Sequence, residues 1–423
     1  MTVANISQRT IRVDVDFYDE TERSKLLHYP TSAALARLVS SPIEIPTAEF
    51  LTYYLFHKKR LGHPAYRDYR SIGARIDTAL GMLDGCVDFD GRSISRAEGD
   101  GAQITEVSEH VGEAVGLSVA NRIHGLTLAD WDLIPTQPGR HGRRTFDFQV
   151  ASDGERFVEL ETKGSSSDDN RLKSDAVKAQ KRRIDEKKDG LGRLTPSDEG
   201  RSAGPLRYGS ITVLDRRPNG TARCWLTDPD AAMTAEDPRR WKLLARMRFL
   251  RDWIAFVSVR SQLAAALATR VADLEALADT RPLERLPLLR GNGKAFDFRS
   301  NEETAPSLFA NKSFVIGGNA GGLVVRMSGG ALFFLGIQHD MVALAARPEP
   351  EALLGYRAEW NSAERVVRCK VNKTTFVSWD LGGALAGEPD GMGSNVEFEL
   401  SGQIHSDESG LVFGVLPLTD GTR

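Results

Sequence analysis

Apolar and polar residues alternate between residues 145 and 164, and this pattern predicts two strands joined by a turn. The first strand covers residues 146–150, and Ser-Asp-Gly at 152–154 has the composition of a turn. The second strand covers residues 157–163. Because side chains of a strand point alternately to its two faces, Val158, Leu160 and Thr162 are expected on one face.

The opposite face of the second strand is predicted to carry Glu159, Glu161 and Lys163. Three charged groups among apolar neighbours are costly unless something holds them. A divalent metal with its bound water would do so. Asp147, on the preceding strand, completes a set of residues that suits metal-assisted phosphodiester hydrolysis. The alternative is a face held by ion pairs, in which Lys163 only neutralises the glutamates.

A helix is predicted over residues 104–123, because valine or isoleucine recurs at every fourth position from Val107 to Ile123. Glu109 and Glu113 fall together on an edge roughly opposite the valines. This edge either faces solvent or points toward the hairpin, into which the helix leads.

Basic residues flank the predicted hairpin. A basic loop precedes it, and a charged helix is predicted to begin near residue 174. Such a helix either presents a solvated face or carries its cations to phosphates, and the sequence leaves both open. The candidate nucleic-acid contacts are Arg143, Arg144, Lys178, Gln180, Lys181 and Arg182.

The remaining pattern divides the chain into further segments. Residues 10–17 alternate like a strand, residues 47–59 and 69–82 read as helices, and residues 208–214 and 221–226 read as strands of the central sheet. Residues 238–278 are strongly helical, and short alternating runs broken by glycine follow from about residue 290. These runs are typical of a β-sandwich or barrel.

We therefore expect an α/β central domain whose mixed sheet is flanked by helices. An N-terminal α/β or helical segment would precede it, and a helical plus β-rich C-terminal region would follow. The predicted boundaries are 1–101, 102–232, 233–285 and 286–423.

The composition of the chain bears on its domain number, its partners and its cellular compartment. A length of 423 residues favours two or three domains, and a net charge of −3 gives the whole chain no attraction to nucleic acid, so any such site must be local. Three cysteines, odd in number and far apart in sequence, favour a reducing compartment and argue against a zinc cluster. No signal-peptide core or membrane-length apolar run occurs, so we expect a cytoplasmic protein that does not contact membranes.

The triplet Glu161-Thr162-Lys163 has little weight alone, because acidic-x-Lys occurs at two other places, beginning at Asp185 and Glu186. Both of those lie in the predicted charged helix, where residues two apart do not share a face. The triplet at residue 161 differs in lying on an alternating strand. An aspartate precedes it, an acidic helix lies before it and a basic helix after it.

With this arrangement, residues 104–226 resemble the PD-(D/E)xK nuclease superfamily, which has the restriction-endonuclease-like fold. By that resemblance Asp147 is the motif aspartate, Glu161 and Lys163 are the E-x-K pair, and Glu109 or Glu113 is the helix glutamate. Gln180 stands where some members carry a glutamine. Phenylalanine replaces the proline that often precedes the aspartate.

The resemblance implies Mg²⁺ as cofactor, with Mn²⁺ as a substitute. The expected ligands are Asp147, Glu161, the carbonyl of Thr162 and Glu113, all oxygen donors of the kind that Mg²⁺ prefers. Lys163 would orient the attacking water and offset charge on the phosphate in the transition state. Glu109 or Glu113 would complete the catalytic set.

We thus expect a metal-dependent nuclease, with DNA favoured over RNA as substrate and restriction or anti-phage defence as its setting. The alternative is a catalytically silent nuclease-fold module that binds nucleic acid or scaffolds a complex. Residues 238–278 or the C-terminal domain are the expected sites of homo-oligomer or protein contacts. The C-terminal domain is also a candidate ligand sensor.

Overall fold

The computed structural model describes the chain in stretches separated by gaps. They are residues 10–27, 32–56, 69–90, 92–96, 101–132, 148–192, 206–217, 220–231, 237–258, 261–276, 308–309, 311–327, 330–346, 349–379 and 395–418.

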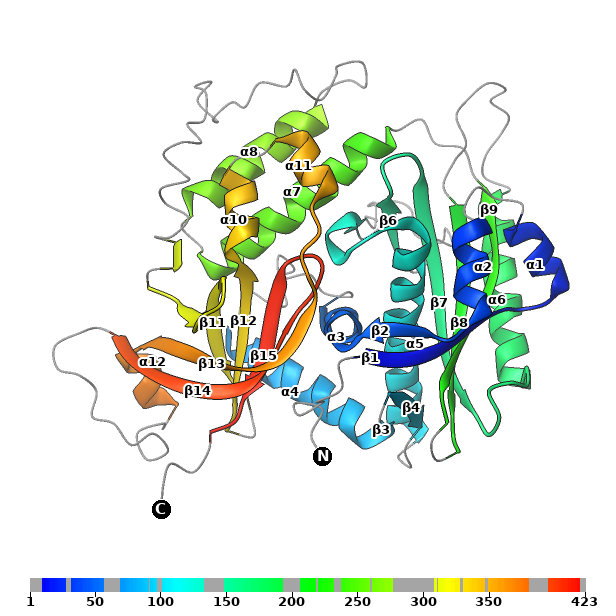
Figure 1. Ribbon diagram of the computed structural model, residues 1–423, viewed down its shortest axis with the longest axis horizontal. Helices are drawn as coiled ribbons and strands as arrows, with labels where there is room; N and C mark the ends of the chain where they lie inside the picture. The colour runs from blue at the N-terminus through cyan, green and yellow to red at the C-terminus, as the bar shows by residue number, and fades with distance from the viewer. Residues whose placement is uncertain are drawn as a thin grey trace. The chain divides into compact units, whose positions relative to one another are not determined.

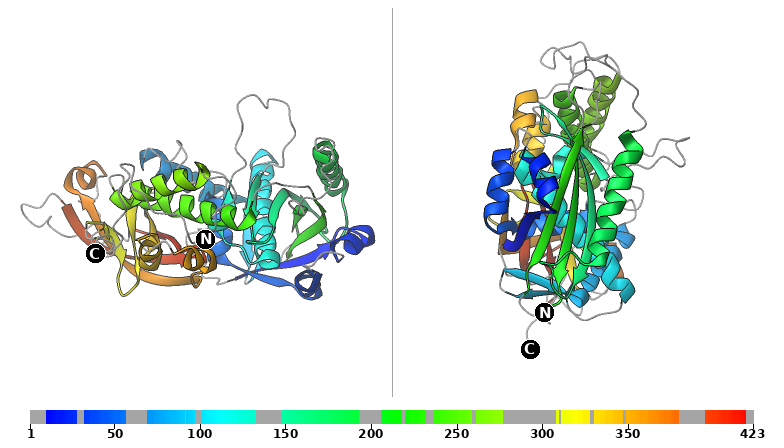
Figure 2. Two further views of the ribbon diagram at one scale, coloured as in Figure 1. Left: turned by 90° about the horizontal axis from the view of Figure 1, so that it is seen from above. Right: turned by 90° about the vertical axis from the view of Figure 1, so that its right-hand side faces the viewer.

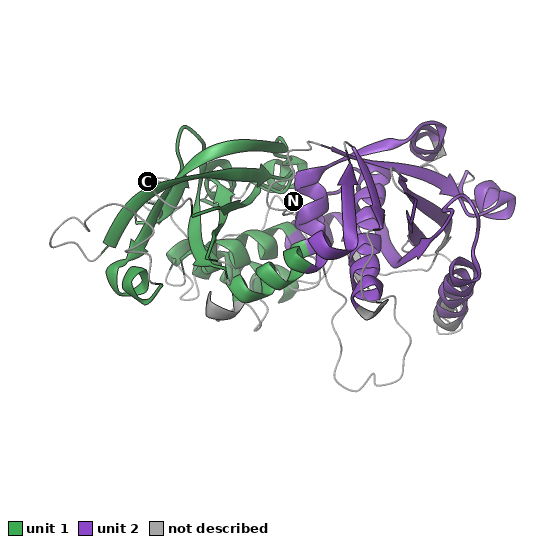
Figure 3. Cartoon of the chain, turned by 90° about the horizontal axis from the view of Figure 1, so that it is seen from below, with its two compact units in different colours: residues 1–9, 55–81, 246–423 green, residues 10–54, 82–245 purple. Residues whose placement is uncertain are grey.

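The chain divides into two compact units, each built from alternating stretches of sequence (Figure 3). We call residues 10–54 and 82–245 the sheet unit. Residues 1–9, 55–81 and 246–423 form the barrel unit. The two units are described separately below.

The sheet unit is built around seven strands in the order β2-β1-β9-β8-β7-β6-β5 (Figure 1). The sheet is mixed: β1 runs parallel to β9 and β7 parallel to β8, whereas the other neighbours are antiparallel. The strands are β1 (Thr10–Phe17), β2 (Ile43–Pro46), β5 (Trp131–Asp132), β6 (Phe148–Ser152), β7 (Phe157–Ser167), β8 (Leu206–Asp215) and β9 (Ala222–Ala231).

Two long helices cover opposite faces of this sheet (Figure 2). α5 (Gly101–His124) packs on the face that carries Thr162 and Ser210. α6 (Asp175–Gly192) packs on the other face, where its Val177 and Ile184 join a buried cluster with β8 and β9. The expected α/β architecture, a mixed sheet flanked by helices, is confirmed.

Shorter elements complete the sheet unit. They are α1 (Glu20–Leu26), α2 (Ser32–Ser40), α3 (Thr47–Phe56), the two-stranded ribbon of β3 (Val87–Asp90) and β4 (Ser93–Arg96), and the 3₁₀ helix η3 (Leu128–Asp130). α3 ends in residues assigned to the barrel unit.

The N-terminal segment differs from the expected separate 1–101 region. β1 forms part of the central sheet because Ile11, Val13 and Val15 are buried and its backbone pairs with β9. Residues 55–81, by contrast, belong to the barrel unit. The alternation along residues 10–17 predicts the strand, but its partner lies some two hundred residues away in sequence, where local patterns carry no information.

The barrel unit contains six antiparallel strands closed in the order β10-β11-β12-β15-β14-β13. A barrel, one of the two predicted β-rich architectures, is therefore observed. The strands are β10 (Ser313–Val315), β11 (Ala320–Arg326), β12 (Leu332–Gln338), β13 (Asn361–Asn372), β14 (Asn395–Ser406) and β15 (Leu411–Leu416).

Helices accompany the barrel strands in sequence. α7 (Pro238–Val257) begins in the sheet unit and ends in the barrel unit, and α8 (Gln262–Ala276) follows it, so the helical segment forms two consecutive helices. The others are α4 (Tyr69–Cys86), which ends in the sheet unit, α10 (His339–Ala346), α11 (Pro350–Gly355) and α12 (Lys373–Ser378). Within the described parts of the chain, no helix has the length and apolar character needed to cross a membrane.

Candidate active site

The centre of the candidate site is Glu161 on β7, whose side chain is completely buried. Two ammonium groups contact its Oε1 atom. Lys163 Nζ lies 2.6 Å away on the same strand, and Lys187 Nζ lies 2.6 Å away on α6. A buried carboxylate needs such partners, because leaving it unpaired would cost several kcal/mol. The sheet face predicted to be charged thus meets a helix that supplies a second cation.

A cavity of about 280 Å³ lies beside these lysines. The described part of β6 pairs with β7 only as far as Leu160, so it does not cover Lys163 and Gly164. The cavity receives side chains from α5, β7 and α6. Its lining residues are Glu109, Lys163, Gly164, Gln180, Arg183, Glu186 and Lys187.

The position of α5 depends on glycines at its contact with β7. A methyl group added at Gly164 would overlap the carbonyl oxygen of Ser108, and one at Gly112 would lie 2.7 Å from the Cα of Gly164. Only glycine permits this close approach of helix and strand backbones. The contact sets Glu109 at the cavity.

The two helix glutamates have different environments, although the sequence pattern places them together. Glu109 is exposed and lines the cavity. Glu113 is buried, with 5 % of its surface exposed, and is absent from the described lining. The structure therefore separates an accessible carboxylate at the cavity from a buried one in the helix packing.

Gln180 connects α6 to the same strand. Its Nε2 atom donates a hydrogen bond to the carbonyl oxygen of Gly164 at 2.8 Å. Gln180 and Lys187 are seven residues apart and so lie on the same face of the helix, with Arg183 between them. This face borders the cavity, while Val177 and Ile184 anchor the helix to the sheet.

Lys181 has a different role from the predicted phosphate contact. Its Nζ atom lies 2.9 Å from Glu22 Oε1 and 2.6 Å from Asp185 Oδ1, and only 12 % of the side chain is exposed. Burial alone would lower the pKa of Lys181, but the hydrogen bonds with Asp185 and Glu22 raise it. These ion pairs tie α6 to α1.

The other predicted basic residues fall into two groups. Lys178 is exposed and pairs with the exposed Asp175, and Arg182 is also exposed. Neither is among the residues that line the cavity. Arg143 and Arg144 lie outside the described residues.

The remaining candidate ligands are placed as follows. Glu159 pairs with Arg207 of β8, with Arg207 Nε 2.9 Å from Glu159 Oε2. The side chain of Thr162 is buried on the α5 face, away from Glu161. Asp147 lies outside the described residues and directly precedes β6 in sequence. Among the side chains that the structure describes, no three acidic, histidine or cysteine groups gather as a metal site.

Sequence reasoning missed Lys187, the second partner of Glu161. The lysine stands in a run of charged residues where any single position looks solvated. Its spacing from Gln180, seven residues or two helical turns, is a signal that places it on the strand-facing side. Arg183 lies three residues after Gln180 and four before Lys187, so the same argument places it on this side of the helix.

The comparisons add no relative to this geometry. No protein-family model, no curated protein and no solved structure matches the chain. Its function is therefore inferred from its own residues.

Proposed function

We propose that the sheet unit is a metal-dependent phosphodiesterase of the PD-(D/E)xK kind, with the restriction-endonuclease-like fold. The observation that carries the proposal is the fully buried Glu161 with two lysines on one oxygen, beside a cavity that an α5 glutamate also lines. Groups with unusual burial and specific charge partners in a cleft are frequent at functional sites.

The proposed ligand set consists of oxygen donors, which suits Mg²⁺ or Mn²⁺. Asp147, Glu161 and the Thr162 carbonyl would hold the ion, with Asp147 included on the sequence pattern alone. Glu113, also expected as a ligand, is buried and does not line the cavity. A bound divalent ion would polarise the phosphate and lower the pKa of a water. The lysine pairs keep Glu161 ionised and in place until then, because they balance its buried charge.

The protein's own groups supply the rest of the chemistry. Lys163, at the cavity and 21 % exposed, would orient the attacking water and offset charge that develops on the phosphate. Lys187 and Arg183, both on α6, add cationic donors to the cavity lining. Glu109 is the catalytic glutamate that we favour over Glu113, because it lines the cavity.

We propose DNA as the substrate and restriction or anti-phage defence in the cytoplasm as the setting. Arg143, Arg144, Lys178 and Arg182 remain the proposed backbone contacts, and Lys181 drops out because its ammonium is held by two carboxylates. Phosphate contacts of this kind give affinity without sequence preference.

A second function is favoured by the same ion pairs. Glu161 already has two cationic partners, so the site is electrostatically balanced by protein groups. Such a site could serve a nuclease-fold module that binds nucleic acid or scaffolds a complex without cleaving. The two functions differ in whether the nucleic acid is cleaved when a divalent ion is present.

The test is cleavage of plasmid, linear and single-stranded DNA and of RNA by the full chain with Mg²⁺, Mn²⁺ or a chelator. We expect metal-dependent cleavage that falls about 100- to 1,000-fold in Lys163→Met, since a lost transition-state charge partner has effects of this size. Lys373→Met is the matched control, because Lys373 is exposed at the start of α12 in the barrel unit and does not line the cavity.

If the wild type cleaves none of these substrates with either metal, the enzyme proposal fails. Metal-independent binding of DNA without cleavage would then support the silent module. Equal cleavage by Lys163→Met and Lys373→Met would also refute the assigned role of Lys163.

A further inference from the structure

The interior of the barrel changes character along its length. Strand residues at alternate positions point inward. Toward one end these positions are filled by apolar side chains, including Leu332, Phe334 and Val367. Continuing the same alternation toward the other end of β12, β13 and β14 gives Gln338, Arg365 and Ser406. The barrel therefore has an apolar floor and a polar mouth.

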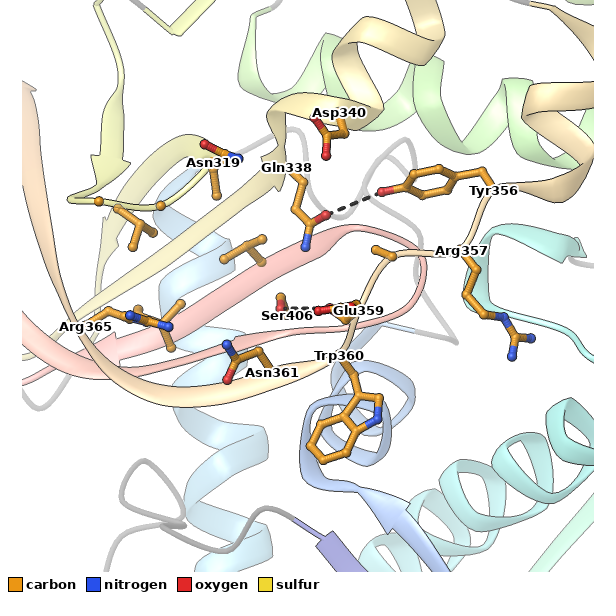
Figure 4. A pocket seen from close by; sticks show the side chains of 17 residues that line it. Asn319, Gln338, Asp340, Tyr356, Arg357, Glu359, Trp360, Asn361, Arg365 and Ser406 are labelled. Atoms are coloured by element: carbon orange, nitrogen blue, oxygen red, sulfur yellow. Dashed lines mark hydrogen bonds between the residues drawn. The ribbon is translucent and has the colours of Figure 1, made fainter.

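A cavity of about 490 Å³ occupies this mouth. That volume is within the usual range of small-molecule sites, and barrel mouths are common places for them. Figure 4 shows the labelled polar side chains around it, while Arg357 and Trp360 project away from the middle of the group. The side chains that concern the argument come from β12, β13 and the first turn of α10.

Arg365 supplies a positive charge on the β13 wall. Its side chain is exposed in the mouth and has no ion pair with any described residue. The neighbouring arginines differ: Arg357 pairs with Glu408 at 3.3 Å, and Arg368 pairs with Glu399 at 2.7 Å. An unpaired guanidinium at a cavity is a donor for the two oxygens of a phosphate or carboxylate.

The opposite wall offers hydrogen-bonding groups. Tyr356 donates its hydroxyl to Gln338 Oε1 at 3.4 Å, which orients the amide and leaves its NH₂ group for another acceptor. Asp340, at the start of α10, lines the same side and forms no ion pair with any described residue. An ionised carboxylate only accepts, so its partner must present N–H or O–H donors.

The two walls are far apart in the barrel. β12 and β13 are separated by three steps around a ring of six strands, which is the largest separation that the ring allows. With strands about 4.8 Å apart, a ligand that engages both walls must be longer than a single amino acid, whose charged groups are adjacent. Its anionic group and its donor edge must lie at opposite ends.

We propose that the barrel mouth binds a nucleotide, with its phosphate at Arg365 and its base at Gln338 and Asp340. The phosphate satisfies the unpaired guanidinium, and the base supplies both donors and acceptors along one planar edge. Among the common bases, guanine presents two adjacent N–H donors, which match the two oxygens of Asp340. Guanine nucleotides are therefore the expected ligands, and this site is independent of the proposed nuclease chemistry.

The test is calorimetric titration of the full chain with GMP, AMP, CMP and UMP, and with guanosine and ribose 5-phosphate as fragments. We expect GMP to bind more tightly than either fragment and more tightly than the other nucleotides. Arg365→Ala should weaken GMP binding at least tenfold. Asp340→Asn should abolish the preference for GMP over AMP, because one carboxylate oxygen becomes a donor.

Arg368→Ala is the matched control, since Arg368 lies on the same strand and its partner Glu399 is outside the cavity. It should leave GMP binding unchanged, as should Lys163→Met in the sheet unit. Circular dichroism of every variant reports whether the fold is retained.

The proposal is overturned if no nucleotide binds at about 1 mM, the weak limit of a useful affinity. It is also overturned if Arg365→Ala and Arg368→Ala behave alike in a folded protein. Ribose 5-phosphate binding as tightly as GMP would refute the base contacts. If the protein binds GMP but cleaves no nucleic acid, only the proposed nuclease function is refuted.

Discussion

The two cavities described above differ in how their charged groups are paired. At the sheet-edge site, where the described part of β6 leaves Lys163 and Gly164 of β7 uncovered, Glu161 is buried and paired with Lys163 and Lys187, which line the cavity. At the barrel mouth, Arg365 and Asp340 face a solvent-accessible space from opposite walls without a described ion-pair partner.

The difference follows from solvation. A carboxylate that loses all contact with water must be balanced by protein groups, or the chain would not fold around it. Exposed charges are hydrated and need no partner. We infer that the sheet-edge site is preorganised for chemistry, whereas the barrel mouth is arranged for recognition. The predictions below test this contrast, beginning with the largest effect.

Gly164→Ala should be the most damaging single change at the sheet-edge site. The added methyl group would overlap backbone atoms of Ser108 and Glu109, so α5 and β7 would have to separate. We expect the free energy of unfolding to fall by about 3 kcal/mol or more, measured by urea denaturation. Gly81→Ala is the control, because a methyl group there meets no atom within 4 Å.

As the pH falls, the stability of the barrel unit should decrease before that of the sheet unit. Burial lowers the pKa of His405 to about 4, and Ser362 Oγ lies 2.8 Å from its Nδ1 atom. Between pH 6.5 and 4 the His405 imidazole is protonated in the unfolded chain but stays neutral in the folded chain. The free energy of unfolding therefore falls as the pH drops from 6.5 to 4. The loss should reach about 3 kcal/mol.

The measurement is hydrogen exchange of the β13–β15 amides between pH 7 and 4, corrected for intrinsic rates. His405→Gln should show no such loss in this range. A wild-type barrel that keeps full protection at pH 4.5 would contradict the prediction.

Lys187→Met tests whether one ammonium group can hold Glu161. Lys163 would remain at 2.6 Å, so we expect a loss of about 1–2 kcal/mol rather than the larger cost of a fully unpaired buried carboxylate. Chemical denaturation compares it with Lys178→Met, whose exposed pair should contribute almost nothing. Cleavage should fall less than in Lys163→Met, because Lys163 is the proposed partner of the water.

Asp153, at the turn between β6 and β7, should give the smallest effect. Burial raises its pKa, but hydrogen bonds from His124 and from the amides of Glu155 and Arg156 outweigh this and hold the pKa below its usual 3.8. Its contribution is present above the unfolded value and is lost as the pH falls from about 5 through the lowered pKa.

We expect a contribution on the order of 1 kcal/mol, typical of hydrogen bonds to a charged group. Hydrogen exchange at the β6–β7 turn in wild type and Asp153→Asn provides the measurement. The two proteins should converge at the acid end of the range, and a constant difference would refute the assignment.

Local patterns predicted several elements well. The alternation of residues 157–163 corresponds to β7, and the valine spacing of 104–123 corresponds to α5. The turn expected at 152–154 lies at 153–156, because Ser152 is still part of β6 and pairs with Phe157. Such patterns can be read from the sequence because apolar side chains recur with the period of the element, two in a strand and 3.6 in a helix.

Contacts between residues far apart in sequence could not be predicted from local patterns. The parallel pairing of β1 with β9 joins distant segments, and the closure of the barrel depends on which strands become neighbours. At the site, the pairing of Lys187 with Glu161 requires α6 to lie on a particular face, which charge-rich residues alone do not specify. Glu109 and Glu113 share an edge in sequence but differ in burial because α5 is covered on more than one side.

The alternation of the two units along the chain has a consequence for dissection and evolution. Residues 55–81 belong to the barrel unit, where Phe56 packs on Trp253 and Phe413, yet they interrupt the sheet unit in sequence. No single cut in the gene yields either unit complete. Either unit is therefore complete only when the whole chain is expressed, and exchanging one half of the gene would leave both units incomplete.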